Sequence, residues 1–499
     1  MKNRLPQLLT LFGLTLAFFN QSANCQGLNL EREAEVYSQV LVKDSYRTPN
    51  NYELPEKIDL SDFVPSVMNQ ENLGTCVGVS SAYYARTILE AVRTGTTRQN
   101  DIDQLRFSPS FLYNAIKDKE DRECLYGTEI RSAMDFMKEN GIASFASQGY
   151  PYCGTNKPLE LPEESKLLDY IRLFDFNYRG EDVVEATQKA LAELTPVVVG
   201  IETTPSLAEM TFWQRIWRKI LRFFGIDKDE ENEFALWKPS EATEMIGGHA
   251  VCLVGYDNNR FGGAFKAVNS WGDRWGDNGF FWIRYSDYPK YTKYAYQPYI
   301  RMAKGTSDIQ LSADINLYFT SFMGEEEVPF DRIFHSKDNA DPQSTNHLVA
   351  YQLREPQESG TQYRFSANID KQSYLYLVSA NATRLRTNVV FPFEGVSPII
   401  GANTNVLLPR EEGLLFQLDR RVGQEYWLFL FSETPLDIEK YVYDMNNGSG
   451  SFPDRVLSIF GEDLVPANQV MYKDKKIGFE IKGDYQGRIV PVMISVEHI

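Results

Sequence analysis

The chain has 499 residues, of which 43% are hydrophobic and 24% are charged. A chain of this length exceeds one ordinary core, so we expect a globular protein of two or three domains. The formal net charge of −17 argues against nucleic acid as a partner, because nucleic-acid-binding proteins present basic faces. The acidic surplus is instead typical of a soluble, self-repelling surface.

The N-terminus is typical of a secretory signal peptide. Lys2 and Arg4 precede an apolar run over residues 8–19, and polar residues follow that run. The run is too short to span a bilayer comfortably, and no later segment is apolar enough to do so. The sequence therefore predicts an exported protein, either periplasmic or secreted.

Small residues before a cleavage site place the end of this signal. Ala23 and Cys25 suit those positions, which predicts a signal peptide over residues 1–25. Anchoring through a lipidated Cys25 is the alternative, although Ser22 and Asn24 fit a lipidation motif poorly. Residues 26–54 are polar and predict a short N-terminal extension before the first domain.

Three separated motifs share the spacing of a nucleophilic catalytic site. Gln70 lies six residues before Cys76, and His249 is the only histidine in the first 300 residues. Asn269 then opens an Asn-Ser-Trp-Gly sequence that contains Trp271. Their order and local contexts resemble the papain family (C1) of cysteine peptidases, in its bacterial secreted type. The resemblance covers residues 55–304 and implies an α+β, two-lobed domain with a helical half followed by a β half.

The resemblance also implies a role for each of these residues. Cys76 would be the nucleophile, its thiolate stabilised by a helix N-terminus and by an imidazolium at His249. Asn269 would orient the imidazole, and Trp271 would shield that hydrogen bond from water. Gln70 would form the oxyanion hole together with the backbone N–H of Cys76. This chemistry requires no metal and no cofactor.

Apolar residues fill the segment that begins at the candidate nucleophile. They predict a largely buried helix from Cys76 to Val92, which Gly95 ends. The sequence 107–113 resembles the start of the family's second helix. Val77 stands where the family commonly has tryptophan, which affects the expected shape of the subsites but removes no reactive group.

Substrate contacts are expected at a second loop. Cys124-Leu125-Tyr126-Gly127 resembles the cysteine–glycine substrate loop of the family. This resemblance implies contacts at Gly127 and Gly248, where an extended peptide could pair with backbone groups. Tyr126 occupies a position where the family has glycine, so we expect its ring either to restrict a subsite or to fold back onto the protein.

The remaining cysteines leave one pair for a disulfide. Cys76 has the catalytic context, and Cys252 lies in an apolar stretch that suits a buried, inert thiol. Export permits disulfides. By elimination, Cys124 and Cys153 are the expected pair.

After residue 304 the pattern of apolar residues changes to period two. Alternation over residues 309–319, 363–369 and 477–481, with apolar runs at 374–378 and 425–431, predicts strands separated by turns. We therefore expect an all-β, sandwich-like domain over residues 305–499. Parts of it resemble a domain found appended to bacterial peptidases and kinases, with no agreed function. The histidines there (His335, His347, His498) have no spaced metal-ligand partners.

One segment carries a separate surface prediction. Residues 211–224 place aromatic and aliphatic side chains on one side of a helix and basic ones on the other. Such a helix suits contact with a membrane surface. Packing of its apolar face on the peptidase domain, as a lid, is the favoured alternative.

Together these features predict an exported cysteine endopeptidase that acts on a peptide or protein substrate. The same triad would also serve an exopeptidase or an amide hydrolase that does not act on proteins. A catalytically silent binding protein with a papain fold is the non-enzymatic alternative.

Overall fold

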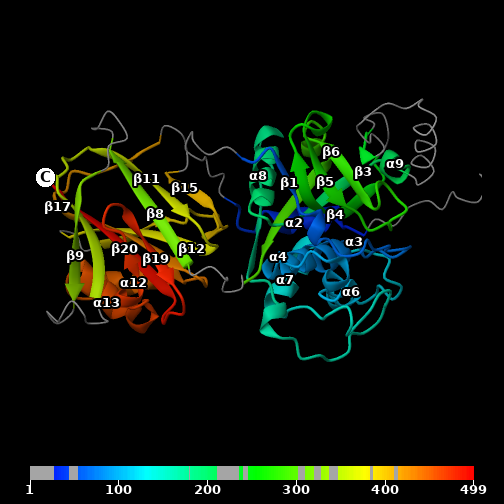
Figure 1. Cartoon of the computed structure of the whole chain (residues 1–499), viewed down its shortest axis with the longest axis horizontal. Helices are drawn as coiled ribbons and strands as arrows, with labels where there is room; N and C mark the ends of the chain where they lie inside the picture. The colour runs from blue at the N-terminus through cyan, green and yellow to red at the C-terminus, as the bar shows by residue number, and fades with distance from the viewer. Residues whose placement is uncertain are drawn as a thin grey trace, which may run out of the picture.

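The computed structural model describes residues 27–43, 54–178, 180–210, 235–239, 245–301, 309–319, 328–336, 347–382, 386–409 and 414–499. Figure 1 shows two domains side by side, the first formed by helices and a sheet and the second mainly by strands. The predicted signal peptide and the predicted basic helix over residues 211–224 lie outside the described residues. No helix in the described part of the chain combines the length and apolarity that crossing a membrane requires.

The helical half of the first domain is built around one long helical segment. It runs through α3 (Cys76–Gly78), a π-helical stretch (Val79–Arg86) and α4 (Thr87–Thr94), and ends at Gly95 in a left-handed conformation, as predicted. Its first two turns are buried throughout. The other helices of this half are α2 (Leu30–Tyr37), α5 (Gln99–Ile102), α6 (Pro109–Ile116) and α7 (Ile130–Glu139).

The β half is an antiparallel sheet with strand order β2-β7-β3-β4-β5-β6, and β1 also pairs with β4. Its strands are β1 (Lys57–Asp59), β2 (Asp169–Arg172), β3 (Val197–Thr203), β4 (Gly247–Asp257), β5 (Ala264–Val268), β6 (Phe280–Arg284) and β7 (Thr292–Tyr299). Helices α8 (Gly180–Ala192), α9 (Pro205–Ala208) and α11 (Tyr288–Tyr291) accompany them. Strand β4 lies inside the sheet and carries His249, which pairs with Ile201 of β3.

The second domain consists of two sheets around one core. The first sheet has the order β13-β12-β17-β20-β10-β9 with β14 beside β12, and the second has the order β15-β11-β8-β19-β18 with β16 beside β11. Apolar side chains of both sheets, among them Phe365, Trp427 and Phe479, form one buried cluster. The strands are β8 (Ile309–Phe319), β9 (Phe330–Ser336), β10 (His347–Leu353), β11 (Gln362–Ile369), β12 (Ser373–Asn381), β13 (Arg386–Phe391), β14 (Ile399–Ile400), β15 (Thr404–Leu408), β16 (Phe416–Gln417), β17 (Gly423–Ser432), β18 (Met471–Tyr472), β19 (Ile477–Lys482) and β20 (Ile489–His498).

The expectation of an all-β domain was wrong in one respect. Two helices, α12 (Ile438–Asn447) and α13 (Phe452–Phe460), cover the outer face of the first sheet. Ser451 and Asp454 form a capping box at the start of α13. In α12 the buried residues Ile438, Val442 and Met445 follow helical spacing. These helices are short, and the period-two pattern of the surrounding strands hides them.

The two domains meet near a buried ion pair in the first domain. Lys43 Nζ lies 2.5 Å from Glu193 Oε1, and the two side chains are only 4% and 7% exposed. Gln297 completes the group, because its amide oxygen accepts from Lys43 at 2.8 Å and its nitrogen donates to Glu193 at 2.6 Å. Removing one charge would leave the other buried without compensation.

We therefore expect Glu193→Ala to lower the free energy of unfolding of the first domain by about 3–5 kcal/mol. The matched variant Lys43→Met with Glu193→Met replaces both charges by apolar groups and should recover most of this loss. Urea unfolding followed by tryptophan fluorescence measures both variants. Equal losses in the single and the double variant would contradict a paired role for the two charges.

Candidate active site

The sulfur of Cys76 lies where the two halves of the first domain meet. The loop before it is tied to both halves, since the Gln70 N–H donates to the Ser270 carbonyl at 2.7 Å and the Gly74 N–H donates to the Cys124 carbonyl at 2.7 Å. Cys76 is the first residue of its helix. From strand β4, the Ala250 N–H donates to Cys76 Sγ at 3.4 Å. The strand that carries His249 therefore contacts the sulfur directly.

His249 is oriented by the two residues that the Asn-Ser-Trp-Gly sequence contributes. Its Nε2 lies 2.8 Å from Asn269 Oδ1. The Trp271 ring stacks on the imidazole with centroids 4.9 Å apart and planes inclined by 26°. Within the described residues, Nδ1 of His249 is buried and has no hydrogen-bond partner. The imidazole therefore has one nitrogen fixed by the amide and the other left for a reaction partner.

Gln70 is buried in the loop before Cys76, with its side-chain amide held at both ends. Its Nε2 donates to the Leu73 carbonyl at 2.8 Å, and its Oε1 accepts a short hydrogen bond from the Ser270 hydroxyl. A primary amide nitrogen carries two hydrogens. The bond to Leu73 uses one of them and fixes the plane of the amide.

We call the space at Cys76 between Thr128 and Gly248 the cleft, and these two residues mark its walls. Residues 27–29 of the protein itself occupy it, with the backbone of Gly27 against Cys76. On one wall, the Thr128 N–H donates to the Gly27 carbonyl at 2.9 Å and the Asn29 N–H donates to the Thr128 carbonyl at 3.2 Å. On the other wall, the Leu28 N–H reaches the Gly248 carbonyl at 3.4 Å. The short N-terminal extension expected from the sequence thus begins as an extended strand between both walls.

Glycines on each wall permit this close approach. Gly127 has a φ of +79°, and a Cβ there would collide with the Gly27 carbonyl oxygen. A Cβ at Gly248 would lie 2.6 Å from the Leu28 carbonyl oxygen, which is shorter than van der Waals contact allows. The two glycines expected to contact substrate therefore contact the N-terminal segment here.

The side chain of Leu28 fills an apolar pocket and is only 5% exposed. A Cβ built on Gly200 would lie 2.7 Å from Leu28 Cδ2, 3.0 Å from a ring carbon of Tyr294 and 3.4 Å from Ile130 Cδ1. Gly200, Tyr294 and Ile130 therefore lie around the Leu28 side chain, which shares a buried cluster with the latter two. The absence of a side chain at Gly200 is what makes room for it.

Helix α2 anchors the segment behind Leu28. The Glu33 carboxylate accepts from the Ile130 N–H at 2.5 Å and from the Tyr296 hydroxyl. Burial raises the pKa of Glu33 to about 7. Tyr37, at the end of the helix, is fully buried among residues of the peptidase core.

Burial also shifts the pKa values of Cys76 and His249. It raises the pKa of the Cys76 thiol to about 11, although hydrogen bonds from backbone groups of Ala250 and Gly27 oppose this shift. It lowers the pKa of His249 to about 4, although the hydrogen bond that Asn269 Oδ1 accepts from the ring opposes this shift. At neutral pH the covered site therefore holds a thiol and a neutral imidazole.

The loop of residues 124–127, which was predicted to contact substrate, is fixed by a disulfide and a carboxylate. Cys124 and Cys153 are joined, and Cys76 and Cys252 are free and buried. Asp121 accepts from the Leu125 and Tyr126 N–H groups at 2.9 and 3.3 Å. The Tyr126 side chain is 64% exposed. Its ring is therefore mostly in solvent rather than packed onto the protein.

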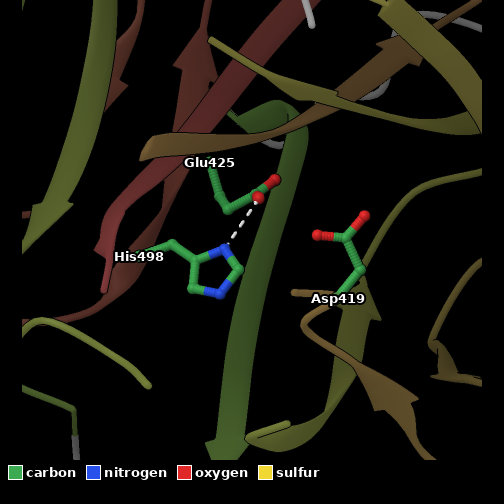
Figure 2. Close-up of side chains that lie close together, drawn as sticks. All are labelled: Asp419, Glu425 and His498. Atoms are coloured by element: carbon green, nitrogen blue, oxygen red, sulfur yellow. Dashed lines mark hydrogen bonds and ion pairs between the residues drawn. The ribbon is translucent and has the colours of Figure 1, made fainter. Parts of the chain in front are cut away.

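A second group of polar residues lies in the C-terminal domain. Figure 2 shows Asp419, Glu425 and His498, whose ligand atoms all lie within 4.8 Å of one another. The Nδ1 atom of His498 lies 3.1 Å from Glu425 Oε1, and its Nε2 lies 3.0 Å from the Ser359 hydroxyl. Both ring nitrogens are thus engaged by protein groups, and a metal ion would have to displace one of these bonds. The cluster instead fastens the last strand of the chain.

Sequence reasoning selected Cys76, His249 and Asn269, which the structure brings to one place, but it missed the occupant of the cleft. A signal for this occupant was present in the neighbouring sequence. Leu28 directly precedes Asn29, which caps helix α2 by accepting from the Arg32 N–H. A capped amphipathic helix directly after a glycine and a leucine indicates a packed segment rather than a free linker.

Comparison with known proteins agrees with this geometry. Residues 228–302 match the family model described as papain family cysteine protease. An uncharacterized peptidase C1-like protein of Acanthamoeba polyphaga mimivirus is 25% identical over 227 residues, which cover 44% of this chain and 64% of that protein. Mouse cathepsin K is 25% identical over 229 residues, which cover 46% of this chain and 59% of cathepsin K.

Among solved structures, xylellain, a cysteine protease from Xylella fastidiosa, is 21% identical with a TM-score of 0.37 and covers 52% of this chain and 91% of xylellain. The chain spans less than two thirds of the length of either curated relative. The family model and the curated relatives support a papain-family cysteine peptidase domain, a peptidase hydrolase, in the first half of the chain.

The state of the thiol gives a direct prediction. With a pKa of about 11, the covered Cys76 thiol should react with iodoacetamide at a rate that keeps rising up to that pH. At pH 8 its thiolate fraction is about 100-fold below that of a thiol with the ordinary pKa of 9.0. Leu28→Asp places a charge in the apolar pocket, should displace the segment and should move the reaction profile to lower pH.

Site-resolved mass spectrometry distinguishes Cys76 from the buried Cys252 in this measurement. Leu28→Met is the matched control, because it keeps an apolar side chain of similar volume. A profile that is the same in all three proteins would show that residues 27–29 do not control the thiol.

Proposed function

We propose that this protein is an exported cysteine endopeptidase whose resting state is covered by its own residues 27–29. One observation carries the proposal: the imidazole of His249 is fixed through Nε2 by Asn269 and keeps Nδ1 free, on the strand that contacts Cys76. The basic and apolar pattern of residues 2–19 and the Cys124–Cys153 disulfide support export, because disulfides persist in oxidising compartments.

Displacement of the segment is the first step of the proposed mechanism. Burial is the largest cause of both pKa shifts. Water entering the cleft therefore lowers the pKa of the thiol and raises that of the imidazole. A proton then moves from Cys76 to His249, and the resulting thiolate attacks the carbonyl carbon of a substrate amide.

The remaining steps use groups that are already oriented. The backbone N–H of Cys76 and the side-chain amide of Gln70 would donate to the oxyanion. The imidazolium of His249 gives its proton to the leaving amine, and the acyl-thioester is then hydrolysed by water. Asn269 and Trp271 keep the ring in one orientation throughout.

The walls of the cleft support a peptide substrate rather than another amide. Both walls bind residues 27–29 through backbone N–H and C=O groups, on Thr128 and on Gly248. Such bonds recognise an extended polypeptide whatever its side chains. A substrate strand would replace the segment on the same groups.

Titration with a thiol-directed epoxide tests the proposal as a whole. Leu28→Asp should take up one equivalent near neutral pH and should hydrolyse an end-blocked fluorogenic peptide. Hydrolysis only of peptides with a free end would indicate an exopeptidase. Labelling without peptide hydrolysis would favour another amide hydrolase, and the absence of both would favour a binding protein.

Three substitutions test the roles of the reacting groups. In the Leu28→Asp background, we expect Cys76→Ala and His249→Ala to abolish peptide hydrolysis almost completely and Asn269→Ala to reduce it. Double variants should be no worse than the worst single one, because the residues act as a unit. Circular dichroism verifies the fold, and unchanged turnover in Cys76→Ala would refute the mechanism.

The exposed ring of Tyr126 generates a prediction about specificity. We expect it to restrict a subsite next to Gly127, so in the Leu28→Asp background Tyr126→Gly should broaden cleavage of a peptide library. Tyr126→Phe is the control, because it keeps the ring and removes only the hydroxyl. Identical cleavage profiles for Leu28→Asp with and without Tyr126→Gly would show that the ring lies outside the subsites.

A further inference from the structure

The N-terminal segment that fills the cleft also reaches the C-terminal domain. Its last described residues, 41–43, form a short strand between the two domains, because Val42 pairs in parallel with Arg172 of β2 and with Val396 of the C-terminal domain. We call this three-part arrangement the interdomain clamp.

Hydrogen bonds in the clamp alternate between the domains. The Lys43 N–H donates to the Arg172 carbonyl at 2.7 Å, and the Arg172 N–H donates to the Leu41 carbonyl at 3.1 Å. On the opposite side, the Val42 N–H donates to the Gly395 carbonyl at 2.9 Å, and the Ser397 N–H donates to the Val42 carbonyl at 3.1 Å. The strand therefore has one bonding edge for each domain.

The clamp is continuous with the part of the segment that covers Cys76. Arg172 Nε donates to the Val40 carbonyl at 2.7 Å, and its guanidinium lies 5.7 Å from the ring centroid of Tyr37 at the end of helix α2. Helix α2 follows directly after Asn29 in the cleft. A rigid helix thus connects the clamp to the cleft.

Direct polar contacts between the domains supplement the clamp. The Tyr374 hydroxyl donates to Asp169 Oδ2 at 3.1 Å, and the Gln372 amide donates to the Ile300 carbonyl at 3.0 Å. Gly401 also lies so close to Glu193 that a Cβ there would collide with its carboxylate. The C-terminal domain therefore sits against the same part of the peptidase domain that holds Lys43.

We propose that the C-terminal domain holds the N-terminal segment in the cleft through the interdomain clamp, and so regulates access to Cys76. This inference rests on the proposed function. By linkage, a change that moves the C-terminal domain away from residues 41–43 weakens the binding of residues 27–29 in the cleft. Displacement of residues 27–29 in turn weakens the contact between the domains by the same factor.

Proline substitutions can break the clamp on one edge alone. Val42→Pro removes the N–H that donates to Gly395 and keeps both bonds to Arg172, while Ser397→Pro removes the N–H that donates to Val42. Val42→Ala and Ser397→Ala are the matched controls, because they retain these N–H groups. Both positions are remote from the catalytic residues, and the full chain is used throughout.

Two measurements report whether residues 27–29 remain bound in the cleft. Hydrogen exchange reports the backbone of residues 27–37, and epoxide labelling reports Cys76. Each lost backbone hydrogen bond should speed both by roughly five- to tenfold relative to the alanine controls. Leu28→Asp, which acts in the cleft itself, shows the maximal effect on each readout.

The outcomes separate the two proposals. Faster exchange and labelling in both proline variants support the clamp. Rates equal to those of the alanine controls, with fast labelling in Leu28→Asp, overturn the clamp and leave the proposed function intact. Faster exchange without labelling in any variant supports the clamp as a structural lock and overturns the proposed function of Cys76.

Discussion

The site depends on the packing of the helix that begins at Cys76 against strand β4. The Ser80 hydroxyl donates to the Ala250 carbonyl at 2.8 Å, and the Ala250 N–H donates to Cys76 Sγ. Further along, the Tyr84 hydroxyl donates to the Asn269 carbonyl at 2.9 Å. One helix therefore holds Cys76, the strand that carries His249, and Asn269. A small shift of this helix relative to strand β4 would therefore move Cys76, His249 and Asn269 apart.

Much of the peptidase domain could be predicted because its signals are local in sequence. The buried helix that ends at Gly95 follows from apolar runs and a glycine, and the constellation of Cys76, His249 and Asn269 follows from residue types in a fixed order. The strands of the second domain follow from alternation. Its helices α12 and α13 did not, because short capped segments between strands give a weak periodic signal.

The occupant of the cleft and the clamp could not be predicted for a different reason. Both arise from backbone hydrogen bonds between segments far apart in the sequence, such as Leu28 with Gly248 and Val42 with Val396. Backbone groups are the same in every residue, so composition carries little information about which strands pair. The glycines at 127, 200 and 248 permit close approach, but they do not identify what approaches.

The bare backbone at Gly200 has an evolutionary consequence. The pocket that it opens holds Leu28 in the resting protein, and the same walls would receive a substrate side chain once the segment has left. Under the proposed covering of Cys76, a substitution that reshapes this pocket for a new substrate side chain would also change how tightly Leu28 binds. Residue 28 and the residues of this pocket are therefore expected to covary among related sequences. A change of substrate specificity would then require a matching change in the N-terminal segment.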